Sequence, residues 1–359
     1  MSVRYVSVQW NRFKLVYDGL SLLAAGSFIA LFERAARTHL AGNDQLSEPV
    51  RQMRAFGSAA FLLLTLILCI GPLARLNRRF LPLLYNRRHL GVLMAGLGVW
   101  HANAVLGHYH AYSNVPKFVS LLRFDATFTS ASWPFQLAGA LALLVLLLMA
   151  ATSHDFWQKF LGATAWKSLH MLVYVAYALA VVHVAFGPLQ VERSALVNGV
   201  FFGSALLVCG LHLAAARVSR KPDQQKPVWV EVSGTRYLDA GCAHDLPEDR
   251  ARPLCVPGAE RIAIVRHRDQ VSAVHGVCAH QGGPLYEGRV IDGCLTCPWH
   301  GWQYRPEDGC APAPFVERVP TYPIRIRAGR VLVDPRPLPL GTVAPAASIS
   351  QEDDHDSAA

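Results

Sequence analysis

The sequence has 359 residues, of which 52% are hydrophobic and only 16% are charged. Ordinary soluble domains have about 25% charged residues, so this composition excludes a disordered chain, a collagen and a disulfide-rich miniprotein. Residues 1–227 carry 21 Lys and Arg against 8 acidic residues, whereas residues 228–359 carry 13 Arg against 17 acidic residues. The basic part is also the apolar part, which indicates loops between membrane helices rather than a surface for nucleic acid.

Six apolar runs follow one another in the first 218 residues, and each approaches the roughly 20 residues that a membrane-spanning helix needs. A single run of this kind is also found in soluble proteins as a buried helix, but six in series with Arg-rich connections are not. We therefore predict a six-helix transmembrane bundle over residues 1–218, followed by a polar linker at 219–227. The predicted spans are residues 15–32, 56–73, 90–112, 133–152, 166–187 and 195–216.

The distribution of Lys and Arg indicates the orientation of this bundle. With both termini in the cytoplasm, the inner segments hold 14 basic residues and the outer loops hold 7. Four Arg in the first outer loop count against this orientation: Arg34, Arg37, Arg51 and Arg54. On balance we expect a multi-pass protein in contact with the lipid of a bacterial inner membrane, with both termini cytoplasmic.

From Val228 onward the pattern changes to alternating apolar and polar residues, in the runs VWVEV, RIAIVR, YPIRIR and RVLVD. Several short runs of this kind, separated by Gly and Pro, predict a small all-β domain over residues 228–338. The fold class is therefore multi-domain, a transmembrane α bundle followed by a small all-β domain. Residues 339–359 are rich in Ala, Ser and acidic residues and are expected to form a disordered tail.

Two short motifs in the β domain contain the strongest chemical signal of the sequence. CAHQGGPL places Cys278 two residues before His280, and CPWHGWQY places Cys297 three residues before His300. Two thiolates and two imidazoles could hold a tetrahedral zinc ion, or an iron–sulfur cluster in which two His replace two Cys on one iron. The flanking glycines favour the cluster, because they allow the backbone to approach its sulfides.

Residues 228–335 resemble a Rieske ferredoxin domain of the kind that supplies electrons to ring-hydroxylating oxygenases. The resemblance implies a [2Fe-2S] cluster in which Cys278 and Cys297 bind one iron, while His280 and His300 bind the other. High-potential Rieske proteins carry a Ser and a Tyr after the second His, and Trp302 stands at the Ser position here while Tyr304 is retained. We therefore expect a cluster of lower, ferredoxin-like potential.

Histidines inside the predicted spans form a second candidate site, because a polar group at membrane depth is costly unless it has a function or a partner. Parallel helices that direct imidazoles toward each other can hold a b-type haem through two His ligands. The third and fifth spans run parallel, so Arg87 and His170 lie near the inner side while His101 and His183 lie further out. His170 precedes His183 by about 20 Å of helix rise, so His101 is expected to pair with His183. Ideal helix geometry does not place His170 and His183 on one face, which leaves structural histidines as an open alternative.

The stretches RRHLGVLMAGLGVWH and LHMLVYVAYALAVVH resemble the ferric-reductase-like transmembrane domain, most closely its haem-binding membrane subunit in the bacterial methionine sulfoxide reductase system. The resemblance implies that His101 and His183 ligate one haem b and that His170 belongs to an inner haem position. Larger members have a His where this sequence has Arg87. A second haem with two ordinary His ligands is therefore in question.

We find no residues expected to be catalytic, and no flavin, nicotinamide or mononuclear-iron oxygenase domain. We therefore expect an electron-transfer component that passes single electrons between a cytoplasmic Rieske cluster and intramembrane haem. A cytoplasmic reductase or a quinol would be the donor, and an unidentified periplasmic protein or compound the acceptor. The alternatives are a membrane-anchored Rieske ferredoxin or redox sensor whose helices only localise the cluster, and a zinc domain on a membrane anchor.

Overall fold

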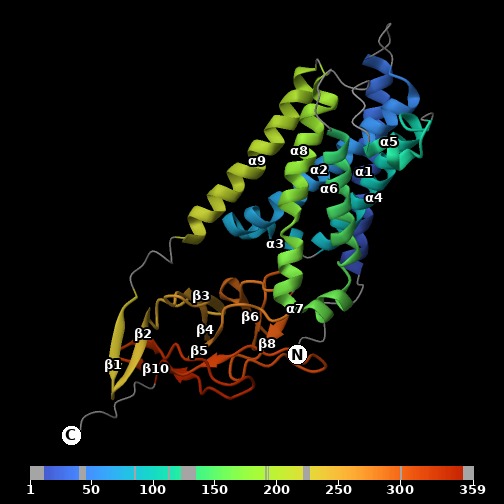
Figure 1. Ribbon diagram of the computed structural model, residues 1–359. Helices are drawn as coiled ribbons and strands as arrows, with labels where there is room; N and C mark the ends of the chain where they lie inside the picture. The colour runs from blue at the N-terminus through green and yellow to red at the C-terminus, as the bar shows by residue number, and fades with distance from the viewer. Residues whose placement is uncertain are drawn as a thin grey trace. The chain divides into compact units, whose positions relative to one another are not determined.

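The computed structural model describes residues 12–39, 46–84, 86–111, 114–122, 135–190, 192, 194–220, 227–299 and 301–350. The chain divides into two compact units, a helical unit within Trp10–Ala215 and a unit that includes Ala216–Ala359. The helices run from blue to yellow in Figure 1, and the strands run from yellow to red. The predicted fold class, a helical bundle followed by a small all-β domain, is confirmed.

Most of the helical unit consists of apolar helices of membrane-spanning length. Five are long and apolar enough to cross a membrane, if the segment Thr164–Gln190, which includes the turn at residues 171–172, is counted as one. Phe135–Ala151 has only 17 residues, at the short end of the range that spans a bilayer. The helices are α1 (Arg12–His39), α2 (Glu48–Leu76), α3 (Leu81–Leu84), α4 (Arg87–His108), α5 (Lys117–Leu122), α6 (Phe135–Ala151), α7 (Asp155–His170), α8 (Val173–Phe186) and α9 (Ala195–Arg220).

The predicted fifth span, residues 166–187, is interrupted by a turn, and a kink at Gly162 precedes it. Gly162 has φ +76° and ψ 160° inside α7, a conformation that glycine adopts because it lacks a Cβ. A turn at residues 171–172 then separates α7 from α8. His170 and His183 therefore lie on different helices, and the face rule for one ideal helix does not apply to them.

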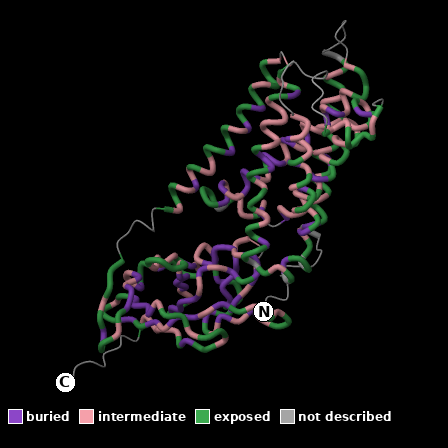
Figure 2. Tube along the Cα trace, in the orientation of Figure 1, coloured by how far each residue is buried: buried purple, intermediate pink, exposed green. Residues whose placement is uncertain are grey.

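The helical unit has an apolar exterior as well as an apolar core. Leu15, Leu20 and Leu31 of α1 are each about 60% exposed or more, and α1 buries none of its most apolar window. Inside, the Phe61 ring stacks on Tyr177 with 5.6 Å between centroids. Figure 2 shows the contrast, with the helices mostly pink and green and the strands largely purple. Exposed leucines along whole helices fit a surface that faces lipid.

The β unit contains two antiparallel sheets among its described residues. One has four strands in the order β1-β2-β11-β10, and the other has the order β12-β5-β4-β3-β6-β7-β8, with β9 also paired to β5. The strands are β1 (Trp229–Val232), β2 (Thr235–Cys242), β3 (Arg250–Leu254), β4 (Ile262–His267), β5 (Gln270–His275), β6 (Arg289–Ile291), β7 (Cys294–Thr296), β8 (Gln303–Tyr304), β9 (Thr321–Tyr322), β10 (Ile324–Arg327), β11 (Arg330–Val333) and β12 (Ala347–Ser348).

Alternation of side chains builds the core of this unit. In β10, Ile324 and Ile326 are buried while the two Arg that follow them are exposed, as the period of two requires. They pack with Ile262 and Ile264 of β4 in one apolar cluster. A second cluster contains Cys278, Cys297 and the side chains around them. The two candidate cysteine ligands therefore belong to the core.

Part of the segment expected to be a disordered tail is ordered. Ala347 and Ser348 form β12, which pairs with β5. Ser348 Oγ also donates a hydrogen bond to Asp269 at 2.7 Å, and the Ile349 amide donates to the Asp269 carbonyl at 2.8 Å. The difference arises because β5 is a sheet edge that takes even a weak strand former as a partner. Residues 351–359 lie outside the described residues.

Replacing Ile264 by Ala tests this core. Ile264 is only 1% exposed, so the truncation loses buried apolar area and leaves a cavity. We expect a loss of about 2–5 kcal/mol in the free energy of unfolding of the β unit, measured by near-UV circular dichroism in denaturant. The control Val343→Ala, at a site 63% exposed, should change stability by less than about 0.5 kcal/mol. Equal midpoints for the two variants would contradict this packing.

Candidate redox sites

Two loops of the β unit form the same kind of backbone turn, each around its own cysteine. The amide of Cys278 donates to the carbonyl of Gly283, and the amide of Gly282 donates back to the carbonyl of Cys278, both at 2.8 Å. In the second loop Cys297 makes the same pair of bonds, with Trp302 at 2.8 Å and Gly301 at 2.9 Å.

The closing glycine of each turn, Gly282 and Gly301, has φ near +70°, which L side chains rarely adopt. Each turn thereby fixes the backbone at its cysteine by hydrogen bonds within the loop.

The two thiols meet in the core. Cys278 and Cys297 are 1% and 2% exposed, and Cys278 Sγ lies 3.3 Å from the hydroxyl of Tyr304. Burial on its own would raise the pKa of the Cys278 thiol. The hydrogen bonds from Cys297, from Tyr304 and from the amides of His280 and Gln281 outweigh burial and hold that pKa below its usual value. These hydrogen bonds offset the cost that burial imposes on the thiolate, which is the form that binds iron.

Glycine also sets the distance between the loops. A Cβ built on Gly283 would lie 2.7 Å from Cys297 Sγ and 3.2 Å from the ring of Trp299. The backbone of the first loop therefore passes closer to the second thiol than any residue with a side chain allows. A close backbone approach to both sulfurs is what an iron–sulfur cluster needs, because amides near its sulfurs stabilise it.

An aromatic stack covers the predicted histidine ligand of the first loop. The His280 ring is nearly parallel to the indole of Trp302, with 4.0 Å between centroids and 6° between planes, and its Nδ1 atom is buried. The ring of Phe315 also packs against the indole of Trp302, with 4.4 Å between centroids. His300, the second predicted histidine ligand, lies outside the described residues. The sequence did not indicate that Phe315 contributes to this stack.

The helical unit brings two of its predicted ligands together. His101 of α4 and His183 of α8 have ring centroids 6.1 Å apart and planes at 79°. Nδ1 of His101 donates to the carbonyl of Met53 at 2.9 Å, and Nδ1 of His183 donates to the carbonyl of Phe135 at 2.8 Å. With the proton fixed on Nδ1, the Nε2 atom of each ring carries no proton and is available to bind a metal.

His170 is held in the same way at the end of α7. Its Nδ1 donates to the carbonyl of Trp166 at 3.0 Å, and its ring stacks on that indole at 3.8 Å. Nε2 of His170 is buried and has no hydrogen-bond partner among the described residues. Arg87, the remaining predicted residue, begins α4 and reaches toward Gly71 of α2. The structure thus provides one facing pair of imidazoles and one additional imidazole.

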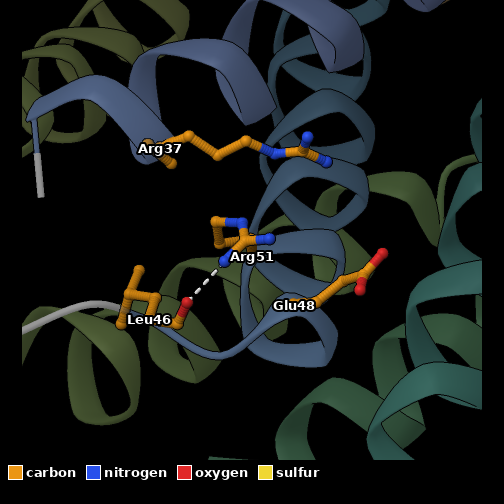
Figure 3. A pocket seen from close by; sticks show the side chains of 5 residues that line it. Arg37, Leu46, Glu48 and Arg51 are labelled. Carbon is orange, nitrogen blue, oxygen red and sulfur yellow. Dashed lines mark hydrogen bonds between the residues drawn. The ribbon is translucent and has the colours of Figure 1, made fainter. Parts of the chain in front are cut away.

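A basic pocket lies between the end of α1 and the start of α2 and contains none of the predicted ligands. Ala36, Arg37, Leu46, Glu48 and Arg51 line it (Figure 3). Nη1 of Arg51 donates to the carbonyl of Leu46 at 2.6 Å, drawn as the dashed line, while Arg37 pairs with Glu33 at 3.3 Å. Arg37 and Arg51, two of the four Arg in the predicted first outer loop, are thus engaged in local contacts.

Comparison with known proteins identifies both units. The family model of the Rieske [2Fe-2S] domain matches residues 236–323. The chain is 41% identical over 105 residues to the anthranilate 1,2-dioxygenase ferredoxin subunit of Burkholderia cepacia, covering 29% of this chain and 96% of that protein. The chain belongs to the Rieske [2Fe-2S] family. The family model of the ferric reductase like transmembrane component matches residues 56–181, so the helical unit contains that domain.

Further relatives agree for the Rieske unit. The ferredoxin component of an alkene monooxygenase system from Xanthobacter autotrophicus is 33% identical over 110 residues, which are 30% of this chain and 89% of that protein. A solved structure, the ferredoxin of carbazole 1,9a-dioxygenase from Nocardioides aromaticivorans, is 23% identical with a TM-score of 0.26, covering 31% of this chain and all of that one. The two family matches support a [2Fe-2S] cluster in the Rieske unit and together fit a membrane electron-transfer protein.

Replacing Tyr304 by Phe tests the hydrogen bond at Cys278. A hydrogen bond to a cluster sulfur stabilises the reduced form, so its loss should lower the reduction potential. A net hydrogen bond of about 0.5–1.5 kcal/mol corresponds to roughly 20–60 mV for one electron. Redox titration followed by the Rieske EPR signal measures this shift. Tyr237→Phe, at a buried tyrosine of β2, should leave the potential unchanged, and an equal shift in both variants would contradict the assignment.

Proposed function

We propose that this chain transfers single electrons between its Rieske cluster and one haem b that His101 and His183 hold in the helical unit. The carrying observation is the facing pair of imidazoles, each with its Nδ1 proton donated to a helix carbonyl. Two ligand bonds of about 2 Å on opposite sides of one iron put ring centroids roughly 6 Å apart, which agrees with the 6.1 Å between these rings. The residues present therefore fit the group.

The ligand set also selects the kind of chemistry. When bound, a haem with two His ligands supplies a one-electron centre with no open coordination position, which suits electron transfer rather than oxygen activation. His101 and His183 supply those ligands from α4 and α8, and Met53 and Phe135 fix their tautomers. In the Rieske unit, Cys278, His280, Cys297 and His300 are the proposed cluster ligands. His170 and Arg87 are the residues proposed for an inner position.

The direction of transfer is proposed from charge. An excess of Lys and Arg in the predicted inner segments supports cytoplasmic termini and a cytoplasmic Rieske domain in a bacterial inner membrane. The four Arg of the first outer loop count against this orientation, and the excess in the inner segments outweighs them. A cytoplasmic reductase or a quinol would then donate the electron, and the acceptor would be periplasmic.

The ferredoxin relatives support a second candidate function. Their names describe components of oxygenase systems, and their match is confined to the Rieske domain. A membrane-anchored ferredoxin or redox sensor would use the cluster alone, with His101 and His183 as structural residues. The tautomer-fixing hydrogen bonds favour the two-centre function, because a structural histidine has no need to keep Nε2 available.

Replacing His101 or His183 by Ala distinguishes the two functions. We expect the wild-type protein, purified in detergent, to give a b-type haem signal in its dithionite-reduced minus air-oxidised spectrum. Each variant should lose that signal and retain the Rieske EPR signal, because the two sites are in different units. His108→Ala, on the same helix α4, should keep the haem. A wild-type protein with iron–sulfur bands alone would exclude the haem and leave the anchored ferredoxin.

Reporter fusions at the C-terminus test the orientation. A cytoplasmic C-terminus should give a fluorescent green fluorescent protein fusion and an inactive alkaline phosphatase fusion, because the phosphatase needs periplasmic disulfides. The reverse pattern would place the Rieske domain outside and reverse the proposed donor and acceptor sides.

A further inference from the structure

We propose that Gly57 and Gly139 are equivalent positioning residues of an internally duplicated pocket, and that they hold the imidazoles of His101 and His183 crosswise. The inference rests on the proposed haem function and adds to it the residues that set the ligand geometry. It concerns α2 with α4 and α6 with α8, which form the two halves of the duplicated pocket.

The two halves repeat at a fixed distance along the chain. His101 follows its carbonyl partner Met53 by 48 residues, and His183 follows its partner Phe135 by the same 48 residues. An offset of 82 residues in the sequence aligns Met53 with Phe135 and His101 with His183. The same offset aligns Gly57 with Gly139. The same offset also aligns residues that are buried in both halves: Leu64 with Leu146, Met94 with Ala176, and Ala95 with Tyr177.

Each half needs a glycine four residues after its carbonyl. In a helix the side chain of a residue covers the turn that precedes it, so the residue at i+4 normally covers the carbonyl at i. Gly57 and Gly139 leave the carbonyls of Met53 and Phe135 uncovered. Those carbonyls can then accept a second hydrogen bond from an imidazole, in addition to the bond within the helix.

The space taken by each missing Cβ is filled by a histidine ring. A Cβ on Gly57 would lie 2.9 Å from Nδ1 and 3.0 Å from Cε1 of His101. On Gly139 it would lie 2.6 Å from Nδ1 and 2.8 Å from Cε1 of His183. At both glycines these distances are too short for a contact with a Cβ atom. An alanine would therefore push the histidine ring away from its carbonyl partner. Since each ring is held by its own half, the two planes are set independently, at 79° to each other.

The wild-type protein gives the first test. Crosswise imidazoles on a low-spin ferric haem give a strongly anisotropic EPR signal with a large maximum g value, whereas parallel imidazoles give an ordinary rhombic one. We expect the strongly anisotropic signal from the purified, air-oxidised full-length protein. A rhombic signal would overturn the proposal even if haem is bound, whereas a protein without haem would instead exclude the proposed function.

Gly57→Ala and Gly139→Ala give the second test. We expect either variant to lower the haem-to-cluster ratio roughly 10-fold or more, or to convert the signal to the rhombic type, because groups that orient a metal ligand have effects of this size. Gly96→Ala in α4 and Gly203→Ala in α9 are matched controls, because a Cβ there meets nothing within 4 Å. Both controls should keep the wild-type ratio and signal.

The Rieske EPR signal of the same chain reports folding in every variant. A variant that keeps this signal but loses or reorients its haem supports the proposal. Haem content, EPR signal and haem reduction potential equal to those of the Gly96→Ala control would overturn it. If one glycine variant fails to accumulate, the other tests the same geometry in the second half, and the wild-type signal remains decisive.

Discussion

An imidazole binds iron through a nitrogen that carries no proton, so its other nitrogen has to keep the proton and needs an acceptor for it. Water and carboxylates meet this need in soluble proteins, but an apolar bundle offers mainly backbone carbonyls that already accept bonds within their helices. A carbonyl oxygen has a second lone pair, and it becomes usable where no side chain covers it. The contacts of His101 with Met53 and of His183 with Phe135 follow from this constraint.

The Rieske unit meets a related constraint with donors in place of acceptors. A buried thiolate is stable only where N–H and O–H groups surround it. The turns at Cys278 and Cys297 supply those groups because Gly282 and Gly301 close them with positive φ. In both units, then, backbone atoms help to position the proposed ligands, and glycines decide which backbone atoms are accessible.

Much of this organisation could be predicted from the sequence. Apolar runs of about 20 residues have few stable structures other than a spanning helix, and the two Cys-His motifs have few uses other than binding metal. Helix rise, together with the parallel direction of the third and fifth spans, predicted the pairing of His101 with His183. Gly57 and Gly139 were not identified, because a glycine in a transmembrane helix is common and its purpose depends on the ring that packs against it. The pairing of β12 with β5 likewise depends on contacts distant in sequence.

The duplication also bears on how many haems the bundle can hold. The shift of 82 residues that superposes His101 on His183 places Arg88 at the position of His170. Nη1 of Arg88 donates to the carbonyl of Ser153 at 2.7 Å, whereas His170 keeps a buried Nε2 with no hydrogen-bond partner among the described residues. The imidazole is therefore duplicated at the level of His101 and His183 and present once at the level of His170. With the proposed haem bound, this asymmetry would provide two His ligands for one haem, and any further group at His170 would need its other ligand from a residue that the repeat does not supply.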